Sequence, residues 1–196
     1  AMEILARRTG GACIATVRVA DELIIAASAG EGQRGTATTL VGQRLPFSPP
    51  TGAVFAAWLN VHERDRWSEG ARHPHVMSAS LKCVVQRGYS VGLRTPAQKV
   101  LSDRLLAAAE RKDQAVDVQD LLDELAYDPP ELTPDLLRNI RLISAPVFNS
   151  AGEVELALTL YDFAKPEAGS GISHYIDQIT SVAQEVTSRL GGFLPD

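Results

Sequence analysis

The sequence predicts an α+β fold in which helices flank an antiparallel sheet. Two pairs of strand-like segments, within residues 12–29 and 141–161, are each joined by a short turn, as in β-hairpins. Helical patterns fall between these hairpins and after the second one. Since strands and helices do not alternate one by one, a parallel sheet of βαβ units is not expected.

The first half of the chain begins with a hairpin. β-Branched and apolar residues recur on both sides of Asp21-Glu22, which marks the turn. A helix should end just before the hairpin, because Gly10-Gly11 follows it. The elements expected in this half are a helix end at 3–8, strands at 12–20, 23–29 and 36–43, and a helix at 49–60.

The second half repeats the mixture of elements. Apolar residues recur at helical spacing in 96–111, 116–127 and 172–190, and 76–87 is also expected to be helical. Gly88 and Gly191 follow two of these four segments as helix-ending glycines. Ser150-Ala151-Gly152-Glu153 reads as a hairpin turn. The elements expected here are helices at 76–87, 96–111, 116–127 and 172–190, and strands at 89–94, 141–149 and 154–161.

The segment RLPFSPPTGAVFAAWL, residues 44–59, has an unusual helix entrance. Ser48 is expected to cap the helix, with Pro49 at its first position. The free backbone N–H groups of the first turn would then gather at Thr51, Gly52 and Ala53, where a ligand carboxylate or phosphate could bind. The alternative is that Gly52 only allows tight packing against the sheet.

Composition indicates an ordinary globular protein. The 196 residues suit one domain, and 45% of them are hydrophobic. The net charge of −5 argues against direct binding of a phosphate backbone. No apolar run is long enough to span a membrane and no secretory signal is visible, so a cytoplasmic protein is expected. Cys13 and Cys83, in apolar contexts, are expected to be reduced and buried.

No catalytic motif or metal site is expected. His73-Pro-His75 could offer two metal ligands, but no further Cys or His stands nearby at a usual spacing. The sequence contains no nucleophile elbow, P-loop or dinucleotide fingerprint. The many acidic residues between Asp103 and Asp135 are expected to form a solvated helical face. We therefore expect neither an enzyme nor a cofactor.

Three segments in order resemble the effector-binding domain of IclR-type bacterial transcriptional regulators. LARRTGG at 5–11 resembles the end of the family's linker helix. GQRLPFSPPTGAVFAAWL at 42–59 resembles its Gly-x-x-x-Pro-Leu pattern followed by small residues and a Gly-Lys-Ala-Leu-Leu-Ala pattern. GYSV at 88–91, ISAPVFNSAG at 143–152 and the strand at 154–161 resemble later family motifs.

The resemblance implies a GAF- or profilin-like fold with a pocket for a small-molecule effector. Residues 1–10 would be the end of a linker helix and 11–192 the effector-binding domain. DNA would be bound only through an N-terminal winged helix-turn-helix domain that this chain lacks. A homodimer or homotetramer is also implied, with no membrane partner.

The resemblance further implies seven ligand-binding positions. They are Pro50, Thr51, Gly52, Gly92, Leu142, Thr159 and Tyr161. Several depart from the family pattern, since an acid is replaced by Gly92 and a small polar residue by Leu142. The expected effector is therefore mostly apolar, with one carboxylate or carbonyl group, in a pocket roomier than one built for a small keto acid.

The segment 95–139 departs most from the family pattern, which has a short connection there. We expect an inserted helical pair whose apolar stripes cover either the pocket, as a lid, or a neighbouring subunit; the lid is favoured. Two other functions remain open, a stand-alone GAF-like sensor module without a DNA partner and, less favoured, a small hydrolase.

Overall fold

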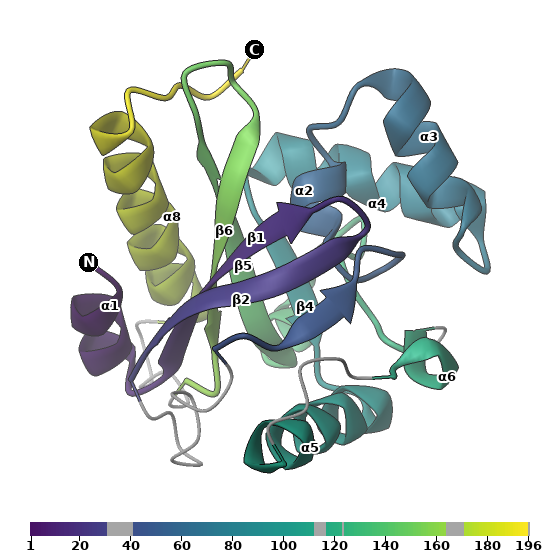
Figure 1. The fold of residues 1–196 in the computed structure, drawn as a ribbon, viewed down its shortest axis with the longest axis horizontal. Helices are drawn as coiled ribbons and strands as arrows, with labels where there is room; N and C mark the ends of the chain where they lie inside the picture. Colours follow the sequence, from purple (N-terminus) through teal and green to yellow (C-terminus); the bar gives the residue numbers. More distant parts are fainter. Residues whose placement is uncertain (31–40, 112–116, 123, 164–170, 196) are drawn as a thin grey trace.

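The computed structural model describes residues 1–30, 41–111, 117–122, 124–163 and 171–195. It contains a six-stranded antiparallel sheet with the order β3-β2-β1-β6-β5-β4, flanked by helices on both faces (Figure 1). The strands are β1 (Ala12–Val19), β2 (Glu22–Ala29), β3 (Arg44–Pro46), β4 (Ser90–Leu93), β5 (Ile140–Phe148) and β6 (Val154–Tyr161). The helices are α1 (Met2–Thr9), α2 (Ala53–Ala56), α3 (Val61–Glu69), α4 (Pro74–Arg87), α5 (Pro96–Glu110), α6 (Gln119–Leu122), α7 (Pro134–Leu137) and α8 (Gly171–Arg189).

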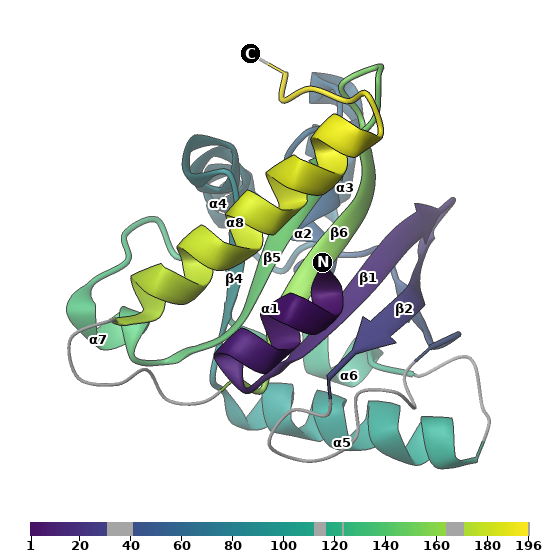
Figure 2. The ribbon, with the colours of Figure 1, turned by 90° about the vertical axis from the view of Figure 1, so that its left-hand side faces the viewer.

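One face of the sheet packs against α1 and α8, which lie side by side in front of the strands in Figure 2. Ile143 and Leu160 of the sheet and Ile179 of α8 are fully buried there. Helix α8 is fixed at its far end because the Thr187 hydroxyl accepts a hydrogen bond of 3.0 Å from the amide of Phe148. This core, against which Leu137 of α7 also packs, closes one side of the sheet and leaves the other for α2 to α6.

The opposite face is covered by α2, α3 and α4, with α5 and α6 on the same side (Figure 1). Leu81 of α4, Trp67 of α3 and Phe55 of α2 pack in one cluster with Ala157 of β6. A separate cluster joins α5 to α6 and reaches β3 through Leu45. The helices on this side thus form two groups over one sheet face.

The predicted fold class is confirmed, and so are both hairpins. Strands β1 and β2 form the first, and β5 and β6 the second. Helix α4 ends at Gly88, whose φ of 80° is the left-handed conformation that a helix-ending glycine adopts. These elements were predictable because alternation and helical spacing report directly which face of an element is buried.

The predicted helix over 49–60 is wrong. Only α2 is helical, and the segment before it is a pair of turns that includes a cis peptide bond between Pro49 and Pro50. Gly52 is the N-cap residue of α2, at a φ of 89°, and the Ser48 hydroxyl is buried without capping it. Prolines disfavour helical conformation in the residue before them, so the two prolines delay the helix.

Two further predictions need correction, and two helices, α3 and α7, were missed. The strand expected at 36–43 lies partly outside the described residues, and its described part, 41–43, is not a strand; β3 follows it directly. The helix expected over 116–127 is reduced to α6. Helix α3 was missed, although Asn60 caps it by accepting a bond of 3.0 Å from the Glu63 amide.

The chain after α6 is drawn to the edge of the sheet instead of continuing as a helix. Tyr127 forms an isolated antiparallel bridge with Gly92 of β4. The amide of Leu93 donates to Ala126 at 2.8 Å, and the amide of Asp128 donates to Val91 at 3.0 Å. Residues 126–128 therefore run beside β4 and tie this segment to the sheet.

Candidate functional site

A cavity of about 160 Å³ lies between the second sheet face and the helices that cover it. The sheet contributes its floor, the turn before α2 contributes one wall, and α5 contributes another. The residues that these three parts bring to the cavity include Ile14, Ile25, Leu142, Ser144, Thr159 and Tyr161 from the strands, Thr51, Gly52 and Phe55 around α2, and Gln98, Leu101 and Leu105 from α5.

Strand pairing explains why the floor residues share one face. Thr159 lies opposite Ile14 on one neighbouring strand and opposite Ser144 on the other. Directly paired residues of antiparallel strands point to the same side, and so does Tyr161, two residues after Thr159. Leu158 and Leu160, on either side of Thr159 in the sequence, face the α8 core.

Most polar groups of the cavity are already bonded to other protein groups. The hydroxyls of Ser144 and Thr159 lie 2.7 Å apart and bond to each other. Arg141 Nη2 donates to Asp162 Oδ1 at 2.5 Å, and these side chains are only 20% and 7% exposed. The charged pair therefore belongs to the wall of the cavity, with each charge held against its opposite.

Two hydroxyls are exceptions. Thr51 Oγ1 and Tyr161 Oη are buried and have no hydrogen-bond partner within the described part of the chain. Both residues line the cavity. Leaving a buried hydroxyl unpaired costs about 1–3 kcal/mol, so each favours a molecule that supplies the missing partner.

Burial raises the pKa of the Tyr161 hydroxyl well above its usual range, and the negative charge of Asp162 raises it further. The side chain therefore stays protonated at neutral pH and keeps an O–H group to donate.

Helix α5 is held over the cavity by its own apolar cluster. Leu101 packs with Leu121, Leu122 and Leu125 of the α6 region. On the same helix, Gln98 accepts a long bond of 3.4 Å from the Tyr127 hydroxyl. The apolar stripe that the sequence predicted for this segment is buried only in part: Leu101 meets both α6 and the cavity, whereas Val100 is exposed. Residues 112–116 of the segment lie outside the described residues.

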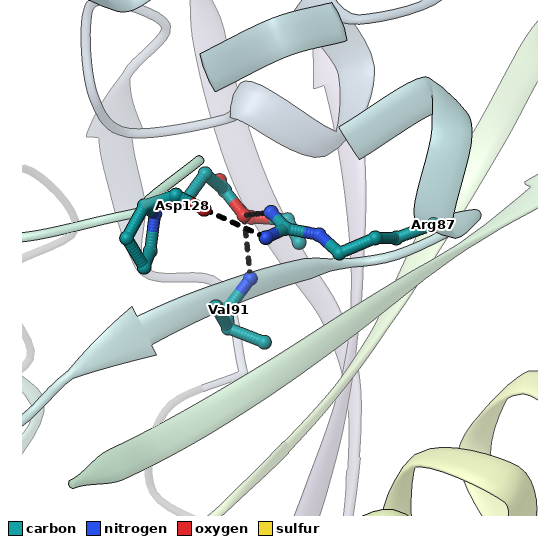
Figure 3. Close-up of polar contacts among 5 residues, drawn as sticks. Arg87, Val91 and Asp128 are labelled. Atoms are coloured by element: carbon teal, nitrogen blue, oxygen red, sulfur yellow. Dashed lines mark hydrogen bonds and ion pairs between the residues drawn. The ribbon is translucent and has the colours of Figure 1, made fainter. Parts of the chain in front are cut away.

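A buried ion pair anchors the same segment (Figure 3). The carboxylate of Asp128, only 1% exposed, accepts bonds from Arg87 at 2.8 Å, the Ser90 hydroxyl at 2.6 Å and the Val91 amide at 2.8 Å. Burial raises the pKa of Asp128 to about 6, although these three donors act in the opposite direction. The expectation that the acids of this region are all solvated is wrong for Asp128.

Five of the seven predicted site residues line the cavity: Thr51, Gly52, Leu142, Thr159 and Tyr161. Pro50 and Gly92 are not among the described residues that line it. A side chain at Gly92 would place its Cβ 2.8 Å from Leu142 Cγ, so this glycine makes room for Leu142. The prediction missed Ser144, which alternation along β5 from Leu142 could have found, and Arg141.

Of the three amides predicted to be free, at Thr51, Gly52 and Ala53, that of Ala53 is already bonded. The Ala53 amide donates to Pro50 at 3.3 Å, and the amides of Phe55 and Ala56 donate to Gly52. With only four residues, α2 also lacks the aligned dipoles of a longer helix. A Cβ at Gly52 would lie 2.7 Å from the Phe47 ring, so the alternative of tight packing holds, even though Gly52 borders the cavity.

The described residues contain no group of three or more His, Cys, Asp or Glu side chains that could hold a metal ion. His73 and His75 are both exposed, at the start of α4. Of the thiols, Cys13 is buried and Cys83 half-buried. In the parts of the chain that are described, no helix has the length and apolar character needed to cross a membrane.

The fold is shared with solved transcriptional regulators. An IclR transcriptional regulator from Alicyclobacillus acidocaldarius matches with a TM-score of 0.63 and 17% identity, over 97% of this chain and 65% of that chain. This chain therefore spans slightly less than two thirds of that regulator.

Two isolated regulator domains match over most of their own length. The C-terminal domain of the E. coli regulator KdgR matches with a TM-score of 0.58 and 17% identity, over 97% of this chain and 93% of that domain. The inducer-binding domain of a double mutant of PobR from Acinetobacter, in complex with 3-hydroxybenzoic acid, matches with a TM-score of 0.59 and 16% identity, over 95% and 93%.

No protein-family model and no curated protein matches the sequence. The structural likeness nevertheless identifies the fold, which is that of the C-terminal domains of IclR-family regulators.

Proposed function

We propose that this chain is the small-molecule effector-binding domain of a transcriptional regulator. The observation that carries the proposal is the cavity, whose surface is mostly apolar and which contains two buried hydroxyls without a partner among the described residues. Pockets of this kind, apolar with a few placed polar groups, are typical of small-molecule sites. The shared fold supports a regulatory role and points away from catalysis.

The ligand is about the size of one substituted ring. A dry apolar cavity of about 150 Å³ in another protein holds benzene, and the cavity here is about 160 Å³. The PobR domain of the same fold was solved with 3-hydroxybenzoic acid, a single-ring molecule. Helix α5 acts as a lid, since it brings Leu101 and Leu105 against the cavity and would exclude water from a bound ring.

DNA binding belongs to a separate N-terminal domain of the complete protein, and the regulator works as a homodimer or homotetramer in the cytoplasm. The net charge of −5 on this chain supports a separate DNA-binding domain, because a phosphate backbone attracts basic surfaces. The effector would then act by shifting the complete protein between states that bind DNA differently.

A gel-shift comparison tests the proposed function. The complete protein should bind the promoter of its own gene, and the ligand that stabilises this domain should change that affinity. The 196-residue domain alone should leave the same DNA unshifted, because its net charge is −5. Selective promoter binding by the domain alone would contradict the proposal, and a complete protein without any DNA-binding segment would favour the stand-alone sensor.

A further inference from the structure

The polar groups of the cavity carry information about the charge of the ligand. Among the described residues that line the cavity, Arg141 is the only cation, and it is bonded to Asp162. A ligand carboxylate could bind Arg141 only by replacing the carboxylate of Asp162, whose side chain is 7% exposed. Breaking a pair that is largely buried is unfavourable, so Arg141 is not poised to receive an anion.

The second observation is the electrostatic environment of the unpaired hydroxyl of Tyr161. Burial raises the pKa of this hydroxyl most, and the charge of Asp162 raises it further. A negative charge that disfavours a phenolate at this place also disfavours a ligand carboxylate beside it.

The third observation concerns the hydrogen-bonding groups that line the cavity and have or lack a partner. The hydroxyls of Ser144 and Thr159 satisfy each other, and Gln98 is bonded to Tyr127. Thr51, which is 7% exposed, and Tyr161 keep buried hydroxyl groups for which the described residues offer no partner. A hydroxyl can donate one hydrogen bond to a neutral acceptor without any charge having to be buried.

We infer that the cavity takes a neutral, single-ring molecule that carries a carbonyl or similar acceptor, which binds the Tyr161 hydroxyl. The inference rests on the proposed function and narrows it, because the sequence left open a carboxylate or a carbonyl. It assigns Tyr161 and Thr51 as the residues that recognise the polar group, and Leu101 and Leu105 of α5 as part of the apolar enclosure of the ring.

Three probes of nearly the same shape test the inference. Acetophenone carries a neutral carbonyl, benzoate carries a carboxylate in its place, and ethylbenzene carries no polar group. By isothermal titration at pH 7.5, acetophenone should bind this domain about tenfold or more tighter than benzoate. Tyr161→Phe should weaken acetophenone about five- to tenfold and leave ethylbenzene unchanged.

Control variants separate recognition from general damage. Tyr175→Phe removes a tyrosine hydroxyl from α8, on the opposite face of the sheet, and should leave all three affinities unchanged. Thr51→Val removes the second unpaired hydroxyl and should reduce the advantage of acetophenone over ethylbenzene. Thermal unfolding of each variant without ligand shows whether it is folded.

The outcomes are distinguishable. Tighter binding of benzoate than of acetophenone would overturn the inference about charge but leave an effector-binding domain in place. Binding of acetophenone that Tyr161→Phe does not weaken would overturn the role of Tyr161. Failure of all three probes to bind would contradict the cavity as a ligand site, and with it the proposed function.

Discussion

Replacing Arg87 by methionine is expected to lower the free energy of unfolding by about 3–5 kcal/mol. Methionine fills a similar volume but leaves the carboxylate of Asp128 without its cation. Asp128 is 1% exposed, so water cannot take over that role. The change is measured by urea denaturation of the variant and the parent chain. If the dependence of the free energy of unfolding on urea concentration is the same for both, the shift of the midpoint gives the loss of stability.

The loss should depend on pH. The pKa of Asp128 is about 6 in the folded protein, and without Arg87 it should rise further. The variant should therefore lose less stability at pH 5, where Asp128 can take up a proton, than at pH 8, where its charge is unpaired. An equal loss at both values would contradict the assignment of the effect to an unpaired charge.

Two further variants complete this test. Arg189 pairs with Glu185 on the surface of α8, and both side chains are more than half exposed. Arg189→Met should cost less than about 1 kcal/mol. Asp128→Asn, made in the Arg87→Met background, should recover part of the loss because it removes the buried charge. Asparagine suits the position because Asp128 has a φ of 46°, where Asn is tolerated.

Replacing Gly52 by alanine is expected to cost about 2–4 kcal/mol, the second-largest effect. Its φ of 89° disfavours any side chain, and the new Cβ would lie 2.7 Å from the Phe47 ring and 3.0 Å from Leu23. The Phe47 ring has little freedom to move, since it is buried and contacts both the Arg18 guanidinium and the Trp67 ring.

Gly88 provides the matched control for that substitution. It has a φ of 80°, but a Cβ there would meet no atom of the described chain within 4 Å. Gly88→Ala should cost about 1 kcal/mol, the backbone effect alone. Equal losses at both positions, measured by denaturant unfolding, would mean that Gly52 is needed only for its φ and not for packing.

Two larger changes, Gly52→Leu and deletion of residues 95–139, are unsuitable for probing the cavity. A leucine at Gly52 would disturb the packing of Phe47 and so confound ligand binding with folding. Deleting residues 95–139 would remove Asp128 and leave Arg87 and Ser90 without their buried partner. Substitutions that remove only a hydroxyl, at Tyr161 or Thr51, avoid both problems.

Much of the fold could be predicted from local patterns. The hairpins, α4 and α8 follow from alternation and helical spacing, because a single buried face decides them. The turns before α2 could not be predicted in this way, since they depend on how Gly52 packs against Phe47. The conformation of residues 126–128 could not be predicted either. Their backbone hydrogen bonds to β4 override the helical pattern that precedes them.

The candidate site was predictable in part. Thr159 and Tyr161 are two residues apart on a strand, so one face had to carry both. The pairing of Arg141 with Asp162 was not predictable, because it joins the start of β5 to the end of β6. Yet the ligand charge that the cavity favours depends on this pair, because Asp162 already binds the Arg141 guanidinium.

The central claim is that the cavity beneath α5 binds a small molecule. A titration of the methyl-labelled domain with acetophenone, followed by two-dimensional ¹H–¹³C NMR, tests it most directly. Shifts are expected at Ile14, Ile25 and Leu101, which line the cavity, and none at Ile143 and Ile179, in the core on the opposite face. Shifts confined to Ile143 and Ile179, or none at all, would contradict it.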